Sequence, residues 1–401
     1  MPTGRSSYGL RADGTCWSWG SAVTSGNNST GSVTSPVQVV GDHRFITAEF
    51  SYDHALGLKD NGQTWGWGPN TYGQLGIGSF SAGSSSPVQV VGNHSFLQIF
   101  TGYQCSIGVK LDYSAWTWGR NNFGQLGINT ATTSTNSPVQ VVGNHSFVRV
   151  MGGSESFYGV KVNNQVWCWG RNDFGQLADN TVTNRSSPVQ IVGGHSFIEI
   201  RTSGYHCVAR KDNGTVWTWG TNSWGQLGTN NITSYSSPVQ VVGNHSFISV
   251  FSEYQGSSYG LKLDGTVWAW GYNNNGQLGT NNLTNYSSPV QVVGNHSFVA
   301  LMGYNGGFRA LKSSGQIWSW GTNGSAQCGV TTAVAYSSPV QVTGSLSFTK
   351  LLSGISTKVS VSGVWRKRPT IFVNKSGVWY KVLNMWTLQG GTWNESDNLN
   401  K

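Results

Sequence analysis

The stretch WTWGRNNFGQLG at residues 116–127, followed by SPV at residues 137–139, contains the motifs that decide the fold. The first motif, Trp-x-Trp-Gly, occurs seven times at spacings of 48 to 51 residues, beginning at Trp17, Trp65, Trp116, Trp167, Trp217, Trp268 and Trp318. Ser-Pro-Val recurs with the same period, as does Gly-Gln-Leu-Gly or a near copy in most units. Seven copies of a unit of roughly 50 residues indicate a repeat architecture.

Each unit is predicted to form four short strands. In residues 144–192, apolar and polar residues alternate in three segments, and Asn163-Asn164 forms a tight turn before the Trp strand. In other units this turn is Asn-Gly or Asp-Gly, which supplies the positive φ of a two-residue hairpin. The two Trp residues of each copy face one side of a strand, so they can pack between neighbouring sheets. No segment has the helical period, and the pattern therefore predicts an all-β, seven-bladed β-propeller of four-stranded blades.

The two ends of the repeat array predict how the ring closes. Residues 4–14 resemble residues 255–265, so the chain starts at the second strand of a unit. The missing first strand occurs once more at Ser347–Gly354. We expect pairing of the N- and C-terminal strands to close the propeller, which gives a domain at residues 1–354 and a separate extension at residues 355–401.

These motifs resemble the repeat of the regulator of chromosome condensation family, over residues 4–354. The resemblance implies a seven-bladed propeller. It says little of function, because members include nucleotide-exchange factors, an inhibitor of β-lactamase, and bacterial and viral proteins of unknown role.

Residues 355–401 show a different period. Gly-x-Trp occurs three times at a spacing of 14 residues, and alternating segments between the copies predict a small extension of β-hairpins. These hairpins resemble C-terminal segments of bacteriophage virion proteins, which implies a segment that anchors the chain in a particle. A solvated basic tail is the alternative. The predicted anchoring residues are Trp365, Arg366, Lys367, Trp379, Lys381 and Trp393.

Composition excludes several classes of protein. Only 10% of residues are charged, and the net charge of +9 is concentrated in residues 355–401, which hold seven basic and two acidic residues. The nearly neutral body makes nucleic acid an improbable partner, since dense phosphate contacts need many cations. No apolar stretch approaches the ~20 residues of a membrane helix, so we expect no membrane insertion. The first residues contain no apolar run, so we expect no ordinary signal peptide. The five cysteines form no Cys-x-x-Cys pair and are expected to be buried as small apolar residues.

No motif predicts catalysis, a cofactor or a metal site. Six units carry a histidine before the first strand, at His43, His94, His145, His195, His245 and His296. Neighbouring copies in such a ring would lie roughly 13 Å apart, whereas zinc requires its nitrogen ligands at ~2.1 Å. We therefore expect a packing role for these histidines, and we expect the chain not to be an enzyme.

The positions that break the repeat are the candidate partner-binding residues. The turns between the first and second strands vary while their flanks stay fixed, and they are rich in Tyr, which suits recognition. Drift of exposed turns is the alternative. The predicted residues on this rim of the propeller are Tyr52, His54, Tyr103, Glu155, Tyr205, His206, Tyr254 and Tyr304. The aromatic residues before Gly-Gln-Leu-Gly (Tyr72, Phe123, Phe174 and Trp224) are expected to pack under their own turn.

These observations favour a non-enzymatic structural or host-recognition protein of a bacteriophage virion. The extension would contact other virion proteins, and the propeller would bind a host-surface protein or glycan. One alternative is an intracellular, cytoplasmic protein-binding propeller such as an exchange factor for a small GTPase. Another is a secreted adhesin or enzyme inhibitor.

Overall fold

The computed structural model covers the chain in two compact units, Met1–Ile355 and Ser356–Lys401. The residues that the structure describes are 6–342, except Ala12, 21–24, 30–32, Tyr52, Asn305, 324–327, Gly329 and 331–333, and, in the second unit, 371–375, 378–382, 387–389, 392–394 and 399–400. All regular elements among them are strands.

The described part of the first unit forms seven antiparallel sheets, each made of strands consecutive in the chain. The first sheet comprises β1 (Ser6–Leu10), β2 (Cys16–Gly20) and β3 (Val33–Gln38), and the second comprises β4 (Thr47–Phe50), β5 (Ala55–Leu58), β6 (Thr64–Asn70) and β7 (Ser81–Gln89). The third comprises β8 (Phe96–Thr101), β9 (Cys105–Lys110), β10 (Ala115–Gly119) and β11 (Thr135–Gln140), and the fourth comprises β12 (Arg149–Gly152), β13 (Ser156–Val160), β14 (Val166–Gly170) and β15 (Arg185–Gln190). The remaining three sheets are β16 (Glu199–Thr202), β17 (His206–Arg210), β18 (Val216–Gly220), β19 (Tyr235–Gln240); β20 (Ser249–Ser252), β21 (Ser257–Leu261), β22 (Val267–Gly271), β23 (Tyr286–Gln291); β24 (Ala300–Tyr304), β25 (Gly307–Leu311), β26 (Ile317–Gly321), β27 (Tyr336–Gln341).

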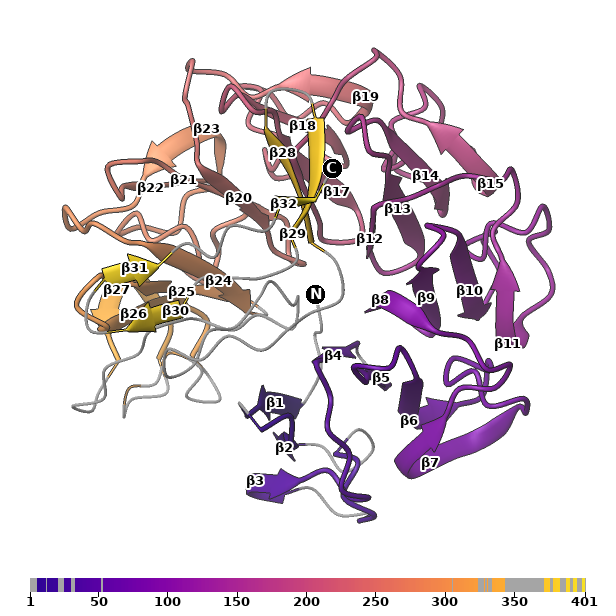
Figure 1. Cartoon of the computed structure of the whole chain (residues 1–401). Coiled ribbons are helices and arrows are strands. Elements are labelled where there is room, and N and C mark those ends of the chain that lie inside the picture. The colour runs from indigo at the N-terminus through magenta and orange to yellow at the C-terminus, as the bar shows by residue number, and fades with distance from the viewer. Residues whose placement is uncertain are drawn as a thin grey trace. The chain divides into compact units, whose positions relative to one another are not determined.

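These sheets are the blades of a propeller, which confirms the predicted fold class. Figure 1 shows first strands such as β4, β8, β12, β20 and β24 nearest the centre, and last strands such as β7, β11, β15, β19 and β23 at the periphery. In the N-terminal blade the described strands are β1, β2 and β3, as expected for a blade that lacks its first strand. The segment predicted to supply that strand, Ser347–Gly354, lies outside the described residues.

The glycine of Trp-x-Trp-Gly is required by its backbone conformation. In the blade β8–β11, Gly119 has φ +102°, and the pairing of β10 with β11 shifts register between Thr117 and Gly119. A Cβ on Gly119 would lie 2.5 Å from the backbone oxygen of Gln104. Because L side chains rarely adopt this φ and no space exists for one, the motif specifies the bulge that widens the loop after each third strand.

In five blades, the second Trp of Trp-x-Trp-Gly joins the blade to the previous one. Trp219, in β18, is fully buried, and its indole Nε1 donates a hydrogen bond to the backbone oxygen of Gln176 in the preceding blade, at 2.8 Å. Trp118, Trp169, Trp270 and Trp320 make the same bond to Gln74, Gln125, Gln226 and Gln277. This contact confirms the predicted packing between sheets for the second Trp of the motif, and it explains why Trp-x-Trp-Gly and Gly-Gln-Leu-Gly repeat together.

In the six blades from β4–β7 to β24–β27, the first Trp of the motif lies between a histidine and a lysine of its own blade. The ring centroids of His145 and Trp167 lie 4.3 Å apart, and Lys161 Nζ lies 4.6 Å from the Trp167 centroid. Partial burial and the Lys161 charge lower the pKa of His145, which favours the neutral ring. Equivalent His–Trp–Lys stacks occur at Trp65, Trp116, Trp217, Trp268 and Trp318. The six histidines therefore pack within their blades.

The second unit consists of small hairpins, as predicted. Strand β28 (Ile371–Lys375) pairs antiparallel with β29 (Val378–Val382), which also pairs with β32 (Leu399–Asn400). Strand β30 (Thr387–Gln389) pairs with β31 (Thr392–Asn394). Of the predicted anchoring residues, Trp379 and Lys381 lie in β29 and Trp393 in β31, whereas Trp365, Arg366 and Lys367 lie outside the described residues.

The interior contains all five cysteines, as the composition predicted. In the part of the chain that the structure describes, no helix has the length and hydropathy needed to cross a bilayer.

Candidate functional site

Because consecutive strands of a blade are antiparallel, the connections between them fall at two opposite ends of the blade. One end carries the turns between first and second strands (51–54, 102–104, 153–155, 203–205, 253–256) and the loops between third and fourth strands (71–80, 120–134, 171–184, 221–234, 272–285). We call it the variable end, because these turns break the repeat. The opposite end carries the second-to-third-strand turns, the connections between blades and the His–Trp–Lys stacks, and we call it the constant end.

At the variable end, two arginines alternate with aromatic rings across successive blades. The guanidinium carbon of Arg120 lies 5.3 Å from the ring centroid of Tyr72 and 5.8 Å from that of Phe123. The guanidinium carbon of Arg171 lies 4.9 Å from the centroid of Phe123 and 5.9 Å from that of Phe174. These five residues form what we call the arginine–aromatic row.

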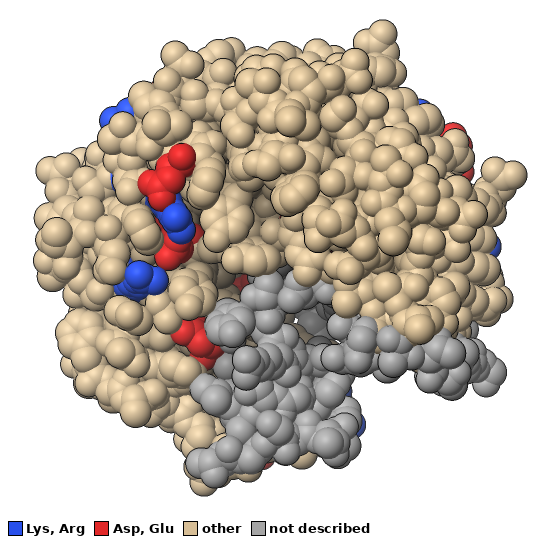
Figure 2. Space-filling model, turned by 180° about the vertical axis from the view of Figure 1, so that it is seen from behind, with Lys and Arg blue, Asp and Glu red and all other residues tan. Residues whose placement is uncertain are grey.

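Carboxylates neutralise the two arginines. Glu155, a predicted rim residue, bridges Arg120 at 3.3 Å and Arg171 at 2.7 Å, and Asp173 pairs with Arg171 at 2.7 Å. Burial acts to lower the pKa of Arg171, but its hydrogen bonds to Asp173 and Glu155 outweigh that effect and raise it. Charged side chains are otherwise sparse on the face in Figure 2, where blue and red groups gather mainly at one place. The row is therefore locally close to neutral.

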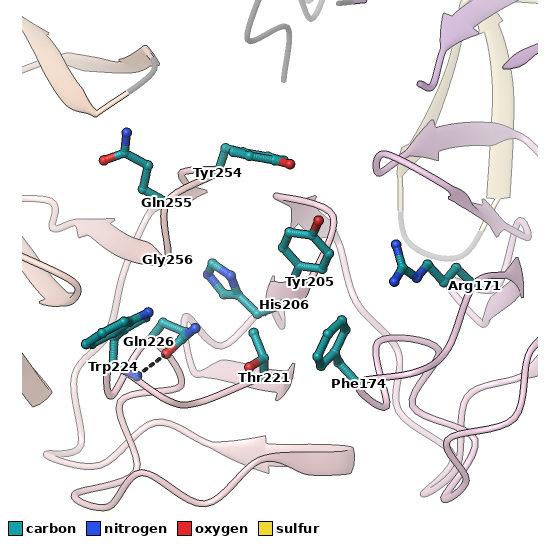
Figure 3. Close-up of a pocket in the computed structure, with 10 residues that line it drawn as sticks. All are labelled: Arg171, Phe174, Tyr205, His206, Thr221, Trp224, Gln226, Tyr254, Gln255 and Gly256. Atoms are coloured by element: carbon teal, nitrogen blue, oxygen red, sulfur yellow. Dashed lines mark hydrogen bonds between the residues drawn. The ribbon is translucent and has the colours of Figure 1, made fainter. Parts of the chain in front are cut away.

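A hollow of about 340 Å³ lies beside the row. Three successive blades line it: Arg171 and Phe174 from β12–β15, Tyr205, His206, Thr221, Trp224 and Gln226 from β16–β19, and Tyr254, Gln255 and Gly256 from β20–β23. Figure 3 shows these side chains around the hollow, with the Trp224 backbone amide donating to the side-chain oxygen of Gln226 at 2.8 Å. The size and the mixture of aromatic and polar groups suit a binding site for a side chain or a small ligand.

Aromatic contacts connect the walls of the hollow. The Phe174 and Tyr205 rings meet edge to face, with centroids 5.3 Å apart, and Tyr205 lies 5.8 Å from Tyr254. Its hydrogen bond with Tyr205, together with burial, raises the pKa of Tyr254 to about 12. Phe174 and Trp224 remain 40% and 44% exposed, so their rings are accessible to a partner.

The floor of the hollow is a hydrogen-bond chain that crosses between blades. The Ser258 hydroxyl donates to the Gln226 backbone oxygen at 2.8 Å, so its oxygen is free to accept from His206 Nε2 at 2.9 Å. His206 Nδ1 then accepts from the Ser203 hydroxyl at 2.7 Å. Complete burial lowers the pKa of His206 to about 3, so the ring is neutral at physiological pH.

The same chain occurs in an earlier blade. His54 contacts Ser51 and Ser106 at 2.8 Å each, and the Ser106 hydroxyl donates to the Gln74 backbone oxygen. The structure thus places both predicted histidines of the rim in the interior, as connectors between blades.

A buried carboxylate lies in the turn that carries Tyr254. Glu253 is 2% exposed and accepts hydrogen bonds from the backbone amides of Gln255 and Gly306, at 2.8 and 3.0 Å. Burial raises its pKa to about 7, although these amides act in the opposite direction. Glu253 therefore fixes the turn by which Tyr254 reaches the hollow.

The structure brings together only part of the predicted rim. Tyr205, His206 and Tyr254 line one hollow, and Glu155 lies in the adjoining ion cluster. The Tyr103 backbone amide donates to Ser154 of the next turn. Tyr52 lies outside the described residues, and Tyr304 is the last residue of β24, with no described side chain.

The sequence reasoning missed the loop that shares this end of the blade. Phe174 and Trp224 were expected to pack under their own turn, yet both line the hollow with exposed rings. The two arginines were also missed, although they stand at a position that varies directly after Trp-x-Trp-Gly. A search for variation in both loops of the variable end would have found them.

Metal and cofactor binding find no support in the described geometry. Within the described ranges, no three His, Cys, Asp or Glu side chains gather as possible metal ligands. The polar groups that line the hollow include two amides, two phenols, the Thr221 hydroxyl, the His206 ring and the Arg171 guanidinium.

Comparison with known families identifies the repeat. The model described as the regulator of chromosome condensation (RCC1) repeat matches residues 61–109, 114–156, 163–210, 213–252 and 264–301, more than half of the chain. A second model of the same repeat matches residues 197–226.

Two curated human proteins illustrate the sequence relatives. The probable E3 ubiquitin-protein ligase HERC6 is 27% identical over 152 residues, which is 37% of this chain and 15% of HERC6. The E3 ubiquitin-protein ligase HERC2 is 29% identical over 187 residues, which is 44% of this chain and 4% of HERC2. The chain therefore matches only a small part of the length of these relatives.

Two solved structures share the fold. Human WBSCR16 has a TM-score of 0.68 and 19% identity, with 82% of this chain and 93% of that chain covered. Prp20p from Saccharomyces cerevisiae, described with its binding to Gsp1p and histones, has a TM-score of 0.68 and 18% identity, with 84% and 87% covered.

These matches correct the functional expectation. The prediction of a bacteriophage structural or host-recognition protein was wrong, because these relatives are human ubiquitin-protein ligases and propellers from human and yeast. Virion partners were likewise a wrong prediction, since the similar yeast propeller is described as binding Gsp1p and histones. A location in the virion has no support among them.

Proposed function

This chain belongs to the regulator of chromosome condensation repeat family, and on that premise we propose that it is a non-enzymatic, intracellular propeller that recognises a protein partner through the variable end. The contact surface comprises the arginine–aromatic row and the hollow beside it. The seven blades act as the scaffold that holds these side chains.

The observation that carries this proposal is the variation of large aromatic and arginine side chains at one end of the blades. The constant end repeats the same His–Trp–Lys stack in six blades, whereas the variable end presents a different set of Tyr, Phe, Trp and Arg side chains in each. Large aromatic residues and arginine are the types that contribute most at protein interfaces. Variation in such residues on a fixed scaffold favours recognition of one partner.

The ligand class follows from the charge of the surface. Arg120 and Arg171 are matched by Glu155 and Asp173, so the row offers little excess positive charge to a nucleic acid. The partners named for Prp20p support a protein as ligand, but identity of 18% carries only the fold. Exchange on a small GTPase is therefore one specific version of the proposed protein recognition.

The extension at residues 355–401 is proposed as a second attachment segment. Its higher density of basic residues, and a Gly-x-Trp period that the repeats lack, support a role apart from that of the blades.

A comparative retention experiment tests the proposal. The full chain, a Tyr205→Ala/Trp224→Ala variant and a Leu263→Ala control are immobilised, and proteins retained from a cell extract are quantified by isotope-labelled mass spectrometry. Leu263 is 85% exposed at the constant end and serves as the matched surface control.

We expect a defined set of proteins to be retained tens-fold less by the double variant, because two aromatic anchors at an interface typically contribute ~2 kcal/mol each. The Leu263→Ala protein should retain the same set as the unmodified chain. Equal retention by all three proteins would refute binding through the variable end.

A further inference from the structure

We propose that the hollow receives the guanidinium group of an arginine side chain supplied by the protein partner. This inference rests on the proposed function and specifies its chemistry. It comes from the arrangement of Arg120 and Arg171 in the two blades that precede the hollow.

The residue directly after Trp-x-Trp-Gly starts from the same backbone position in three successive blades. The backbone amides of Arg120, Arg171 and Thr221 donate to the backbone oxygens of Gln104, Glu155 and Tyr205, at 2.8, 2.9 and 3.0 Å. Each oxygen belongs to the first turn of the same blade. The side chains therefore leave the backbone from equivalent places.

In the blades β8–β11 and β12–β15, the side chain at this position lies between aromatic residues of neighbouring long loops. Arg120 lies between Tyr72 and Phe123, and Arg171 lies between Phe123 and Phe174. The next gap is bounded by Phe174 and Trp224, which correspond to the same loop position.

In this third gap the side chain is too short to fill the space. The Thr221 side chain is shorter than an arginine side chain would be at this position. The hollow lies beyond it, and Thr221 is among its lining residues (Figure 3). Gly256 on the following blade adds room, since a Cβ there would approach Gln226 Nε2 to 3.2 Å. The hollow is thus an arginine site of the row from which the arginine is missing in this chain.

The walls suit a planar cation. Phe174, Trp224, Tyr205 and Tyr254 present aromatic rings, whose faces are negative and attract a guanidinium within ~6 Å of the centroid. The Tyr hydroxyls and the Gln255 amide can accept hydrogen bonds from its N–H groups. Arginine stacks on such rings and is more weakly hydrated than lysine, so the hollow should prefer it.

Nearby charges do not oppose a second guanidinium. Arg171 is the cation among the lining residues, and it is paired with both Glu155 and Asp173. The Glu253 carboxyl group precedes Tyr254 in the chain and contributes further negative charge when it is ionised. A cationic partner side chain therefore meets a site whose own cation is already neutralised.

The first test introduces an arginine at the equivalent position of this chain. Thr221→Arg is compared with Thr221→Gln, which introduces a shorter, uncharged polar side chain. We expect a higher melting temperature for Thr221→Arg than for Thr221→Gln, because the guanidinium enters the gap between Phe174 and Trp224. A melting temperature of Thr221→Arg at or below that of Thr221→Gln would overturn the inference.

The second test leaves the chain intact and uses a small probe. N-acetyl-arginine methylamide is titrated against the isotope-labelled protein and compared with the uncharged citrulline analogue of the same shape. The readout is the indole N–H resonance of Trp224, identified from its absence in Trp224→Phe. We expect a saturable shift, at least about fivefold weaker for citrulline, as loss of a cation–π contact implies.

The outcomes separate this inference from the proposed function. An equal response to both probes, or no response to either, would refute the arginine site, while loss of retained proteins in Tyr205→Ala/Trp224→Ala would still support recognition by the variable end. A selective response that disappears in Thr221→Arg would support the arginine site whatever the retention experiment shows.

Discussion

The two ends of the blades use the same interaction in different ways. At the constant end a lysine and a histidine stack on the first Trp of every complete blade, with Lys–ring distances of 3.7 to 4.7 Å. At the variable end Arg120 and Arg171 contact aromatic rings of the long loops in two successive blades, and a hollow occupies the next equivalent place. The comparison indicates that a contact repeated in every blade serves packing, whereas a contact that changes from blade to blade is available for recognition.

The largest expected effect is a difference in the free energy of unfolding between substitutions at two Trp residues five positions apart. Trp219→Ala should lower the free energy of unfolding by about 3–5 kcal/mol, because the ring is fully buried and its indole bond to Gln176 is lost. Trp224→Ala should lower it by only about 1 kcal/mol, because 44% of that residue is already exposed. Urea unfolding of the two variants measures the difference. Similar losses would show that Trp224 belongs to the core.

The next largest effect compares two histidines of one blade. His206→Ala should cost about 2–4 kcal/mol, because the buried hydroxyls of Ser203 and Ser258 each lose a partner. His195→Ala removes a half-buried ring that stacks on Trp217 and should cost about 1 kcal/mol. Thermal unfolding at pH 8 compares them. A larger loss for His195→Ala would contradict the assignment of His206 as a connector between blades.

The pH dependence of stability should differ in sign between His206 and Glu253. The pKa of His206 is lowered by burial to about 3, so its contribution is present above pH 6.5 and declines as the pH falls from 6.5 towards 3. The pKa of Glu253 is raised by burial to about 7, so its contribution is present below pH 4.5 and declines as the pH rises through 7.

Between pH 4.5 and 6.5 these two contributions change with pH in opposite directions and offset each other. Glu253→Gln should therefore make the stability rise with pH over this range, whereas the His206→Ala protein should show a decline of stability with rising pH. Unfolding curves taken across this range test the assignment. If Glu253→Gln unfolds with the pH profile of the unmodified chain, the buried carboxyl group is not the titrating residue.

The smallest expected effect concerns the constant end alone. Lys110→Met keeps the length of the side chain but removes the charge that lies 3.7 Å from the Trp116 centroid. The loss should be about 0.5–1 kcal/mol at this partly exposed site, with no change in retained partner proteins. Loss of partner retention in Lys110→Met would assign a recognition role to the constant end.

Much of the fold could be predicted from the sequence, because the repeat determines both the period and the contacts. Trp-x-Trp-Gly and the Asn-Gly or Asp-Gly turns specify strands and hairpins within one unit, and seven copies specify the ring. The sequence also indicated that the first turns are the candidate surface, and Tyr205 and Tyr254 do line the hollow.

The rest of the site could not be predicted, because it depends on contacts between blades. The turn of one blade meets the long loop of another, so residues such as Phe174 and Tyr254, eighty positions apart, share one hollow. The roles of His54 and His206 also depend on burial, because each ring is hydrogen-bonded to a serine of the next blade. Alternation in the sequence does not show whether such a histidine lies in an exposed turn or in a buried contact between blades.

Site-directed photo-crosslinking tests the central claim, recognition through the variable end, most directly. A photoreactive phenylalanine derivative replaces Phe174 or Trp224 at the variable end, and Val162 or Leu263 at the constant end. All four side chains are at least 40% exposed. We predict that irradiation in a cell extract yields the same crosslinked protein from positions 174 and 224 and none from positions 162 and 263. Crosslinks to a common protein from positions 162 and 263 alone would contradict the claim.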